Sequence, residues 1–350
     1  MTPKNKLQLS STVGVALLTL TTSLIGCSPE TNQTPVVSPI ATESQTVKPE
    51  TLPQVVATDS VTCGLTKEIA GETIDLKCLI DPGSDPHVYE PKPDDRKSIE
   101  TAQLILYAGY NFEPSLIKLI TATSNPAPKI AVNEIAVPSP LMSEEGHSHD
   151  HDREKESKSN PTAEKEVDPH VWHSAKNGIE IARTISKNLI ALRPDKAETY
   201  TQNTTRVTTE IDRIDTWIKA QIATIPASQR KLVTTHDALG YYSKTYGVPI
   251  EGALSGISTE EQPTATRIKE LVKVIKDAQV PTVFAEITIN PKLIEAVAKE
   301  ANVKVSEREL FADGLGAKGS EAETYAGMLI ANTKSIVEGL GGKYTPFVPK

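Results

Sequence analysis

The sequence has few aromatic residues and no excess of positive charge. Phe, Trp and Tyr together make up 4% of its 350 residues, and the formal net charge is −8. A protein that follows the phosphates of DNA or RNA needs a clustered basic surface, which this balance does not supply. We therefore expect no nucleic acid partner. A chain of this length is sufficient for two ordinary soluble domains.

The sequence also lacks an apolar run long enough to cross a bilayer comfortably. Lys4 and Lys6 precede a mostly apolar stretch from Val13 to Gly26, which is the pattern of a secretory signal. The letters LIGC, ending at Cys27, resemble a bacterial lipobox, in which the cysteine is lipidated and becomes the first residue. We expect residues 1–26 to be removed and Cys27 to anchor the protein in the cell envelope, on the periplasmic side. An uncleaved anchor, or an ordinary signal with a chance cysteine, is the alternative.

Cysteine is scarce. Apart from Cys27, the sequence has only Cys63 and Cys78. An exported protein meets an oxidising environment, so this even pair predicts a disulfide. Two buried free thiols are the alternative. A metal site at either cysteine is disfavoured, since no histidine or second cysteine lies at close spacing.

Composition divides the rest of the chain into a tether and two lobes. Residues 27–51 are almost wholly Ser, Thr, Pro, Gln, Glu, Asn and Val without a period, which is typical of a disordered tether. In residues 52–194, β-branched strands alternate with helices, which predicts a parallel α/β lobe. Residues 226–350 repeat the order of strand, helix, glycine and strand, which indicates a second α/β lobe.

A long helix is predicted between the lobes. Apolar residues recur at helical spacing over residues 195–225, and Asp195 is expected to cap the helix at its start. A rod of this length can brace two domains. In the first lobe, the letters KIAVN at 129–133 predict a strand.

Three histidines lie where the strands of an α/β protein are expected to end. His87 in GSDPHVYEP and His170 in DPHVWHS each follow an Asp-Pro dipeptide, and His236 follows a predicted strand in LVTTHDALG. Any one of them alone is more often a structural residue than a ligand. Loops at the carboxyl ends of strands can converge on one ligand, however, and three imidazoles form a set that zinc favours.

A fourth ligand is expected from the segment LFADGLG. It places Asp313 after another predicted strand, and Gly314 and Gly316 would permit a tight turn toward a ligand. Spacing alone supports this assignment less than it supports the three histidines.

Six segments, in order over about residues 52–342, resemble the zinc/manganese solute-binding lipoproteins of ATP-binding-cassette (ABC) importers. They are VVATDSVTCGLTKEIAG, GSDPHVYEPKPDD, DPHVWHS, LVTTHDALGYYSKTYGVP, FAEITINPK and LFADGLG. The resemblance implies two parallel-sheet α/β lobes joined by a long rigid helix, with a metal ion in the cleft between them. It implies a membrane permease as partner and a monomeric receptor. The family's four ligand positions fall on His87, His170, His236 and Asp313.

The same resemblance bears on the metal. The family's third ligand is a histidine in zinc-type members and a glutamate in manganese-type members, and here it is His236. Imidazole suits zinc, whereas manganese prefers oxygen-rich sites, so we expect Zn²⁺, with Mn²⁺ as the alternative. His173 lies outside the four positions and is expected either beside the ligands or facing solvent. The pair Cys63 and Cys78 is not part of the family pattern.

The segment EEGHSHDHDREKE resembles the histidine-rich loop of zinc-type members. It carries His147, His149 and His151 within the charged stretch 143–158, whose composition does not support a core. We expect it to collect or sense zinc weakly beside the cleft. A solvated low-complexity insertion without a binding role is the alternative.

Two other classes of function remain open from the sequence. A closed four-ligand shell leaves no position for a reacting water, so no enzymatic activity is expected. An envelope zinc hydrolase would need a carboxylate base beside the metal; the chain has no H-E-x-x-H motif, and Glu286 is the one candidate. An adhesin, or a metal buffer without an importer, is the third reading.

Overall fold

The computed structural model of this protein describes residues 51–143 and 166–349. These described residues form one compact unit. The predicted signal peptide, the lipidation site Cys27 and the three histidines His147, His149 and His151 lie outside the described residues. Among the helices described, none combines the length and the apolarity needed to cross a membrane.

The first lobe is built on a parallel sheet with the strand order β2-β1-β3-β4. On β1, Val55 packs with Leu65 of α1 in one apolar cluster, whereas Val56 packs with Leu116 of α3 in another. Alternate side chains of a strand point to opposite faces, so helices must cover both sides of this sheet. Its elements are β1 (Gln54–Ala57), α1 (Ser60–Ala70), β2 (Asp75–Cys78), α2 (Pro93–Thr101), β3 (Leu104–Tyr107), α3 (Pro114–Ala122), β4 (Lys129–Ala131) and α4 (Val132–Ala136).

The second lobe contains two parallel strand pairs, β7 with β8 and β9 with β10. The backbone N–H of Phe284 donates to the carbonyl of Val233 at 2.9 Å, which joins the two pairs side by side. The predicted α/β class with parallel strands in both lobes is therefore confirmed. The elements are β7 (Leu232–Thr234), α7 (Gly240–Tyr246), β8 (Ile250–Ala253), α8 (Ala265–Asp277), β9 (Thr282–Val283), α9 (Lys292–Ala301), β10 (Lys304–Val305) and α10 (Tyr325–Gly339).

The two lobes begin with the same unit of strand, helix and parallel strand. β1, α1 and β2 form it in the first lobe, and β7, α7 and β8 form it in the second. Each helix ends at a glycine with positive φ, Gly71 at 55° and Gly247 at 73°. Glycine adopts this conformation without the steric cost that a side chain would add, so it ends both helices and lets the chain return as a strand.

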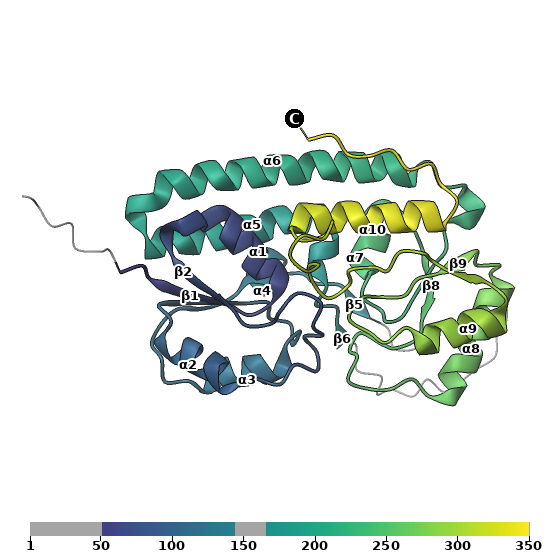
Figure 1. Cartoon of the computed structure of the whole chain (residues 1–350), viewed down its shortest axis with the longest axis horizontal. Helices are drawn as coiled ribbons and strands as arrows, with labels where there is room; N and C mark the ends of the chain where they lie inside the picture. The colour runs from purple at the N-terminus through teal and green to yellow at the C-terminus, as the bar shows by residue number, and fades with distance from the viewer. Residues whose placement is uncertain (1–50, 144–165, 350) are drawn as a thin grey trace, which may run out of the picture. The chain divides into compact units, whose positions relative to one another are not determined.

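Two long antiparallel helices, α5 (Ala175–Leu192) and α6 (Ala197–Ile222), lie alongside each other (Figure 1). The 26 residues of α6 correspond to about 39 Å of helix. α6 contacts α1 and α5 as well as α7 and α10, so it packs against elements of both lobes. The predicted cap at Asp195 is wrong: Lys196 occupies the N-cap position, and Asp195 instead pairs with Arg193 at 2.8 Å. The exact lobe boundaries at residues 194 and 226 stay predictions.

A short antiparallel pair, β5 (Met142–Ser143) and β6 (Glu166–Val167), was not predicted. It brings together the two described ends that flank residues 144–165. Val167 leads directly into Asp168, Pro169 and His170, so this pair lies next in sequence to the second candidate ligand.

Candidate metal centre

The two Asp-Pro-His segments form the same local turn. The aspartate side chain accepts the backbone N–H of the histidine two residues on, at 3.0 Å from His87 to Asp85 and at 2.9 Å from His170 to Asp168. The proline between them fixes its own φ and so restricts the turn. The sequence thus uses one local device twice to orient an imidazole from the first lobe.

His236 and Asp313 belong to the second lobe. His236 lies two residues beyond β7, and Asp313 lies three residues beyond Leu310, which forms a parallel bridge with Glu286. Both therefore follow the carboxyl ends of parallel strand segments, where α/β proteins place their ligands.

The structure brings the four side chains together. One nitrogen or oxygen atom from each of His87, His170, His236 and Asp313 lies within 4.8 Å of the others. The Nε2 atoms of His87 and His170 are 3.3 Å apart, and Asp313 Oδ1 lies 3.1 Å from His236 Nε2 and 3.4 Å from His170 Nε2. Ligand atoms around tetrahedral zinc, with bonds of about 2.0 to 2.1 Å, are about 3.3 Å apart. The spacing therefore suits one small ion at the centre.

The four side chains are withdrawn from solvent. His170 and His236 are 0% exposed, Asp313 is 1% exposed and His87 is 3% exposed. The ring of Phe112 packs edge-on against both His87 and His170, with centroids 5.1 and 5.6 Å away. Of the four, His87 alone lines a cavity of about 50 Å³ that also contacts Val167 of β6. Protein atoms would replace almost all of the water around an ion at this centre.

Two further carboxylates hold the outer nitrogens of the imidazoles. Nδ1 of His170 donates to Asp168 Oδ1 at 2.9 Å, and Nδ1 of His236 donates to Glu286. These bonds leave Nε2 of both rings unprotonated in the neutral form and directed at Asp313. Carboxylate partners of this kind orient metal-binding histidines and make them better donors to the ion.

The candidate centre combines acids and histidines at close spacing, and these groups shift one another's pKa values. Burial alone would lower the pKa of His236, but the carboxylates of Asp313 and Glu286 raise it well above the usual value. Burial also opposes ionisation of Asp313, yet the neighbouring His236 and His170 hold its pKa well below the usual range. Burial lowers the pKa of His87 to about 3, and the opposing effect of the Asp313 carboxylate is too small to reverse this. His87 is therefore neutral at pH 7, so one of its ring nitrogens keeps a lone pair.

Comparison with known proteins identifies the family. The model for the ZnuA family, described as the periplasmic zinc-uptake complex component A, matches residues 55–339. The chain belongs to the ZnuA family. Members are metal-binding receptors of ABC importers and not enzymes, which confirms the resemblance noted from the sequence motifs.

Individual relatives in this family carry different metals in their names. The manganese ABC transporter substrate-binding lipoprotein PsaA of Streptococcus anginosus is 33% identical over 82% of this chain and 89% of its own length. The metal-binding lipoprotein FimA of Streptococcus parasanguinis is 32% identical over the same shares. Among solved structures, the periplasmic zinc-binding protein TroA of Treponema pallidum is 31% identical, with a TM-score of 0.74 over 83% of this chain and 99% of that one. The relatives thus establish the family and the two-lobed fold, and their names include both manganese and zinc.

His173 lies beside the metal centre of this ZnuA-family chain and is not one of the four convergent side chains. It is fully buried, and its Nε2–H donates to the carbonyl oxygen of Ala312 at 2.8 Å. Burial and the neighbouring His170 lower the pKa of His173 to about 3, which keeps it neutral. Of the two expectations for His173, the one that it faces solvent is wrong.

Glu286 does not have the freedom that a hydrolase base would need. One of its oxygens accepts the backbone N–H groups of Thr235 and His236 at 2.9 and 3.0 Å, and the other accepts the His236 ring. Glu286 is 1% exposed, and both of its oxygens already accept these hydrogen bonds. The sequence suggests Glu286 only as the base of a hydrolase, whereas in the structure it is the partner of His236. The role of Asp168 as the partner of His170 was not predicted, although Asp168 belongs to the Asp-Pro-His motif.

Cys63 and Cys78 form a disulfide in the structure, with Cα atoms 5.7 Å apart. The bond connects α1 to the last residue of β2, and the chain that follows β2 leads to His87. The disulfide therefore joins structural elements and lies outside the group of four convergent side chains.

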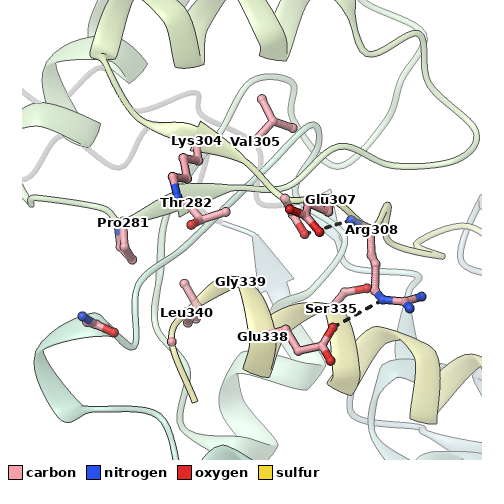
Figure 2. A pocket seen from close by; sticks show the side chains of 13 residues that line it. Pro281, Thr282, Lys304, Val305, Glu307, Arg308, Ser335, Glu338, Gly339 and Leu340 are labelled. Atoms are coloured by element: carbon pink, nitrogen blue, oxygen red, sulfur yellow. Dashed lines mark hydrogen bonds and ion pairs between the residues drawn. The ribbon is translucent and has the colours of Figure 1, made fainter. Parts of the chain in front are cut away.

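A larger hollow in the second lobe does not have a metal-ligand set. This hollow of about 650 Å³ lies between the β9–β10 pair and the end of α10. Figure 2 shows the side chains that line it. Its Arg308 pairs with Glu338 at 3.3 Å and with Glu321 at 2.8 Å. Since these charges satisfy one another and none of the four convergent side chains lines the hollow, we do not assign the metal to it.

Proposed function

We propose that this protein is a high-affinity extracytoplasmic Zn²⁺ receptor whose ligands are His87, His170, His236 and Asp313. The observation that carries the proposal is the convergence of one donor atom from each side chain within 4.8 Å in a buried centre. Two ligands come from each lobe, so a bound ion joins the lobes and stabilises the folded protein.

Zinc is proposed over manganese because of the donor set. Three imidazoles and one carboxylate form a shell typical of zinc, whereas manganese favours carboxylates, carbonyls and water. Mn²⁺ is the second candidate, and the names of the PsaA relatives are the specific observation in its favour. His236, which stands where manganese-type relatives are expected to have glutamate, is the residue on which the choice depends.

The proposed receptor binds and releases its cargo without changing a covalent bond. Asp168 and Glu286 keep the Nδ1 hydrogens of His170 and His236, so Nε2 of each ring can donate a lone pair to the ion. Asp313 supplies one negative charge, and its other oxygen accepts the hydroxyl of Thr288 at 3.0 Å. The loaded receptor would then deliver Zn²⁺ to a membrane permease of the ABC type.

We further propose that the receptor is a monomer anchored by a lipid on Cys27. The relatives are named lipoproteins, and the LIGC segment supplies the corresponding cysteine. An adhesin or metal buffer without an importer is the rival to the proposed delivery of zinc to a permease. It predicts normal zinc uptake in cells that lack the protein, whereas a receptor predicts uptake that falls at low zinc concentration.

The proposed accessory role of His147, His149 and His151 is supported by the ends of their segment. β5 and β6 pair at Met142 with Val167, and Val167 lines the same cavity as His87. The described residues on either side of 144–165 therefore lie close to the proposed metal centre, which is the support for a role of these histidines in collecting zinc.

Elemental analysis combined with metal competition tests the choice of metal. Purified protein, stripped and then offered equal Zn²⁺ and Mn²⁺, is expected to retain one equivalent of zinc. The variant His236→Glu replaces an imidazole with a carboxylate and should shift the preference toward manganese. Retention of manganese by the unchanged protein would overturn the zinc assignment, and absence of any bound metal would overturn the receptor proposal. The variant Glu300→Gln, at an exposed position of α9, serves as the control.

A further inference from the structure

The turn that carries Asp313 rests on α1, a helix of the other lobe. The backbone N–H of Leu315 donates to Ser60 Oγ at 2.9 Å, across 255 positions of sequence. Ser60 is 7% exposed and Leu315 is 3% exposed, so water does not compete strongly for this bond. Asp59 accepts the N–H of Thr62 at 2.9 Å, which holds the first turn of α1 in place under the contact.

Glycines on both sides allow this close approach. A Cβ atom on Gly314 would overlap Ser60 Oγ, and a Cβ atom on Gly64 of α1 would come within 2.6 Å of Leu315 Cδ1. Neither glycine has a positive φ, so a side chain at either position would conflict with the short distance between helix and turn, and not with the backbone conformation. This corrects the expectation that Gly314 serves to permit a tight turn.

The first lobe also holds the other side of the same turn. Trp172 Nε1 and His173 Nε2 both donate to the carbonyl of Ala312, at 3.2 and 2.8 Å. Asp313 is therefore bracketed by two main-chain contacts, one at Ala312 from the segment that follows His170 and one at Leu315 from Ser60. Each contact ties the backbone of a second-lobe residue to the first lobe.

We propose that Ser60 is a positioning residue for Asp313. Its hydroxyl group fixes the Asp313 carboxylate, from the second lobe, relative to the imidazoles of His87 and His170 from the first. The proposal rests on the proposed function, since it assumes that these side chains bind the ion. A ligand set that is assembled before the ion arrives loses less conformational freedom on binding, and the affinity is correspondingly higher.

The variant Ser60→Ala tests this role. It removes the one hydrogen bond to Leu315 and should weaken zinc affinity about fivefold, which corresponds to about 1 kcal/mol. The visible absorption spectrum of bound Co²⁺, which reports ligand number and geometry, should also change toward that of Asp313→Asn. Thr66→Val is the matched control: its hydroxyl lies on the same helix but bonds within it, to the carbonyl of Thr62 at 2.7 Å. The control should retain the wild-type affinity and Co²⁺ spectrum.

A double-variant cycle keeps the test independent of general damage to the fold. Gly314→Ala alone should weaken zinc affinity more than Ser60→Ala does, because the new methyl group meets Ser60 Oγ. Adding Ser60→Ala should restore part of that loss, since only Ser60 Cβ would remain, at 3.7 Å. A Ser60→Ala variant with unchanged affinity and Co²⁺ spectrum, or a double variant with simply additive losses, overturns the inference. Failure of the wild-type protein to bind Co²⁺ or Zn²⁺ would instead overturn the proposed function.

Discussion

Glu286 binds His236 through both the ring and the backbone. One carboxylate oxygen accepts the Nδ1 hydrogen of His236, and the other accepts the backbone N–H groups of Thr235 and His236. The two residues come from neighbouring strand ends, and the pairing leaves His236 Nε2 3.1 Å from Asp313 Oδ1. The pairing therefore fixes the orientation of the His236 ring, which is the third proposed ligand.

The variant Glu286→Gln tests how much this orientation contributes. A glutamine keeps the size of the side chain but removes the negative charge that makes His236 a strong donor. We expect zinc affinity to fall about 10- to 100-fold, the usual effect of losing such a partner. Competition with a fluorescent zinc chelator measures the change, with the exposed Glu300→Gln as control. Equal affinities for the two variants would show that the pairing does not tune the site.

Zinc binding should become weaker as the pH falls. Metal must displace protons from the histidines, and neighbouring carboxylates raise the pKa of His236 and, through Asp168 and Asp313, that of His170. Competition should therefore begin at a higher pH than the ordinary histidine value of about 6.5 would suggest. Calorimetry in two buffers of different ionisation enthalpy should detect proton release at pH 7. A constant affinity from pH 8 to pH 5, without proton release, contradicts this expectation.

Deletion of residues 143–158 should leave the high-affinity site intact. None of the four proposed ligands lies in this segment, so calorimetry should still show one tight zinc site. The additional weak zinc binding due to His147, His149 and His151 should disappear. Replacing these three histidines with asparagine, without shortening the chain, is the matched control. Complete loss of tight binding in the deletion would refute the accessory role, and unchanged weak binding would favour an insertion without function.

Much of the fold could be predicted because local patterns and tertiary packing agree. The β-branched segment at Gln54–Ala57 forms a strand, and the segment with helical period forms α5. In both, the apolar residues are buried as the sequence pattern predicts. Three of the four convergent side chains lie beside distinctive local signals: Asp-Pro before His87 and His170, and a strand end before His236. Asp313 also follows a strand end, but its assignment depended on the family resemblance of the segment LFADGLG.

Tertiary contacts decided the features that the sequence did not reveal. The strand predicted over KIAVN ends at Ala131, and Val132 begins the short helix α4. In this helix, the backbone N–H of Asn133 donates to the carbonyl of Ala108. Aspartate is a residue type that often caps helices, but the carboxylate of Asp195 pairs with Arg193 instead. The roles of Glu286 and Ser60 depend on partners 50 and 255 positions away, which periodicity along the chain does not report.

Loss of the disulfide should destabilise the protein. The bond between Cys63 and Cys78 closes a loop of 15 residues, for which the chain-entropy model gives about 3 kcal/mol. The double variant Cys63→Ser and Cys78→Ser should therefore melt at a lower temperature than the oxidised protein. Adding a reductant should lower the melting temperature of the parent protein and leave that of the double variant unchanged. Equal melting temperatures without reductant would show that the bond does not contribute to stability.

A buried carboxyl group away from the ligands should make stability depend on pH. Glu113 is 1% exposed, and burial together with the nearby Asp59 raises its pKa from 4.5 to about 8. Its oxygen Oε1 accepts Thr58 Oγ1 and the N–H of Ala108, each at 2.8 Å, and both bonds can be kept by a glutamine.

The sign of the effect follows from proton binding. Below about pH 4.5 both the folded and the unfolded states carry the proton on Glu113, and its contribution to stability is complete. Between pH 4.5 and 8 only the folded state keeps it, so the free energy of unfolding falls as the pH rises, by up to about 1.4 kcal/mol per pH unit. Urea unfolding of the metal-free protein at pH 5, 6.5 and 8 should show this decline, and Glu113→Gln should reduce it. The exposed Glu300→Gln should retain the parent slope, and the same slope in Glu113→Gln would mean that Glu113 is ionised in the folded protein throughout this range.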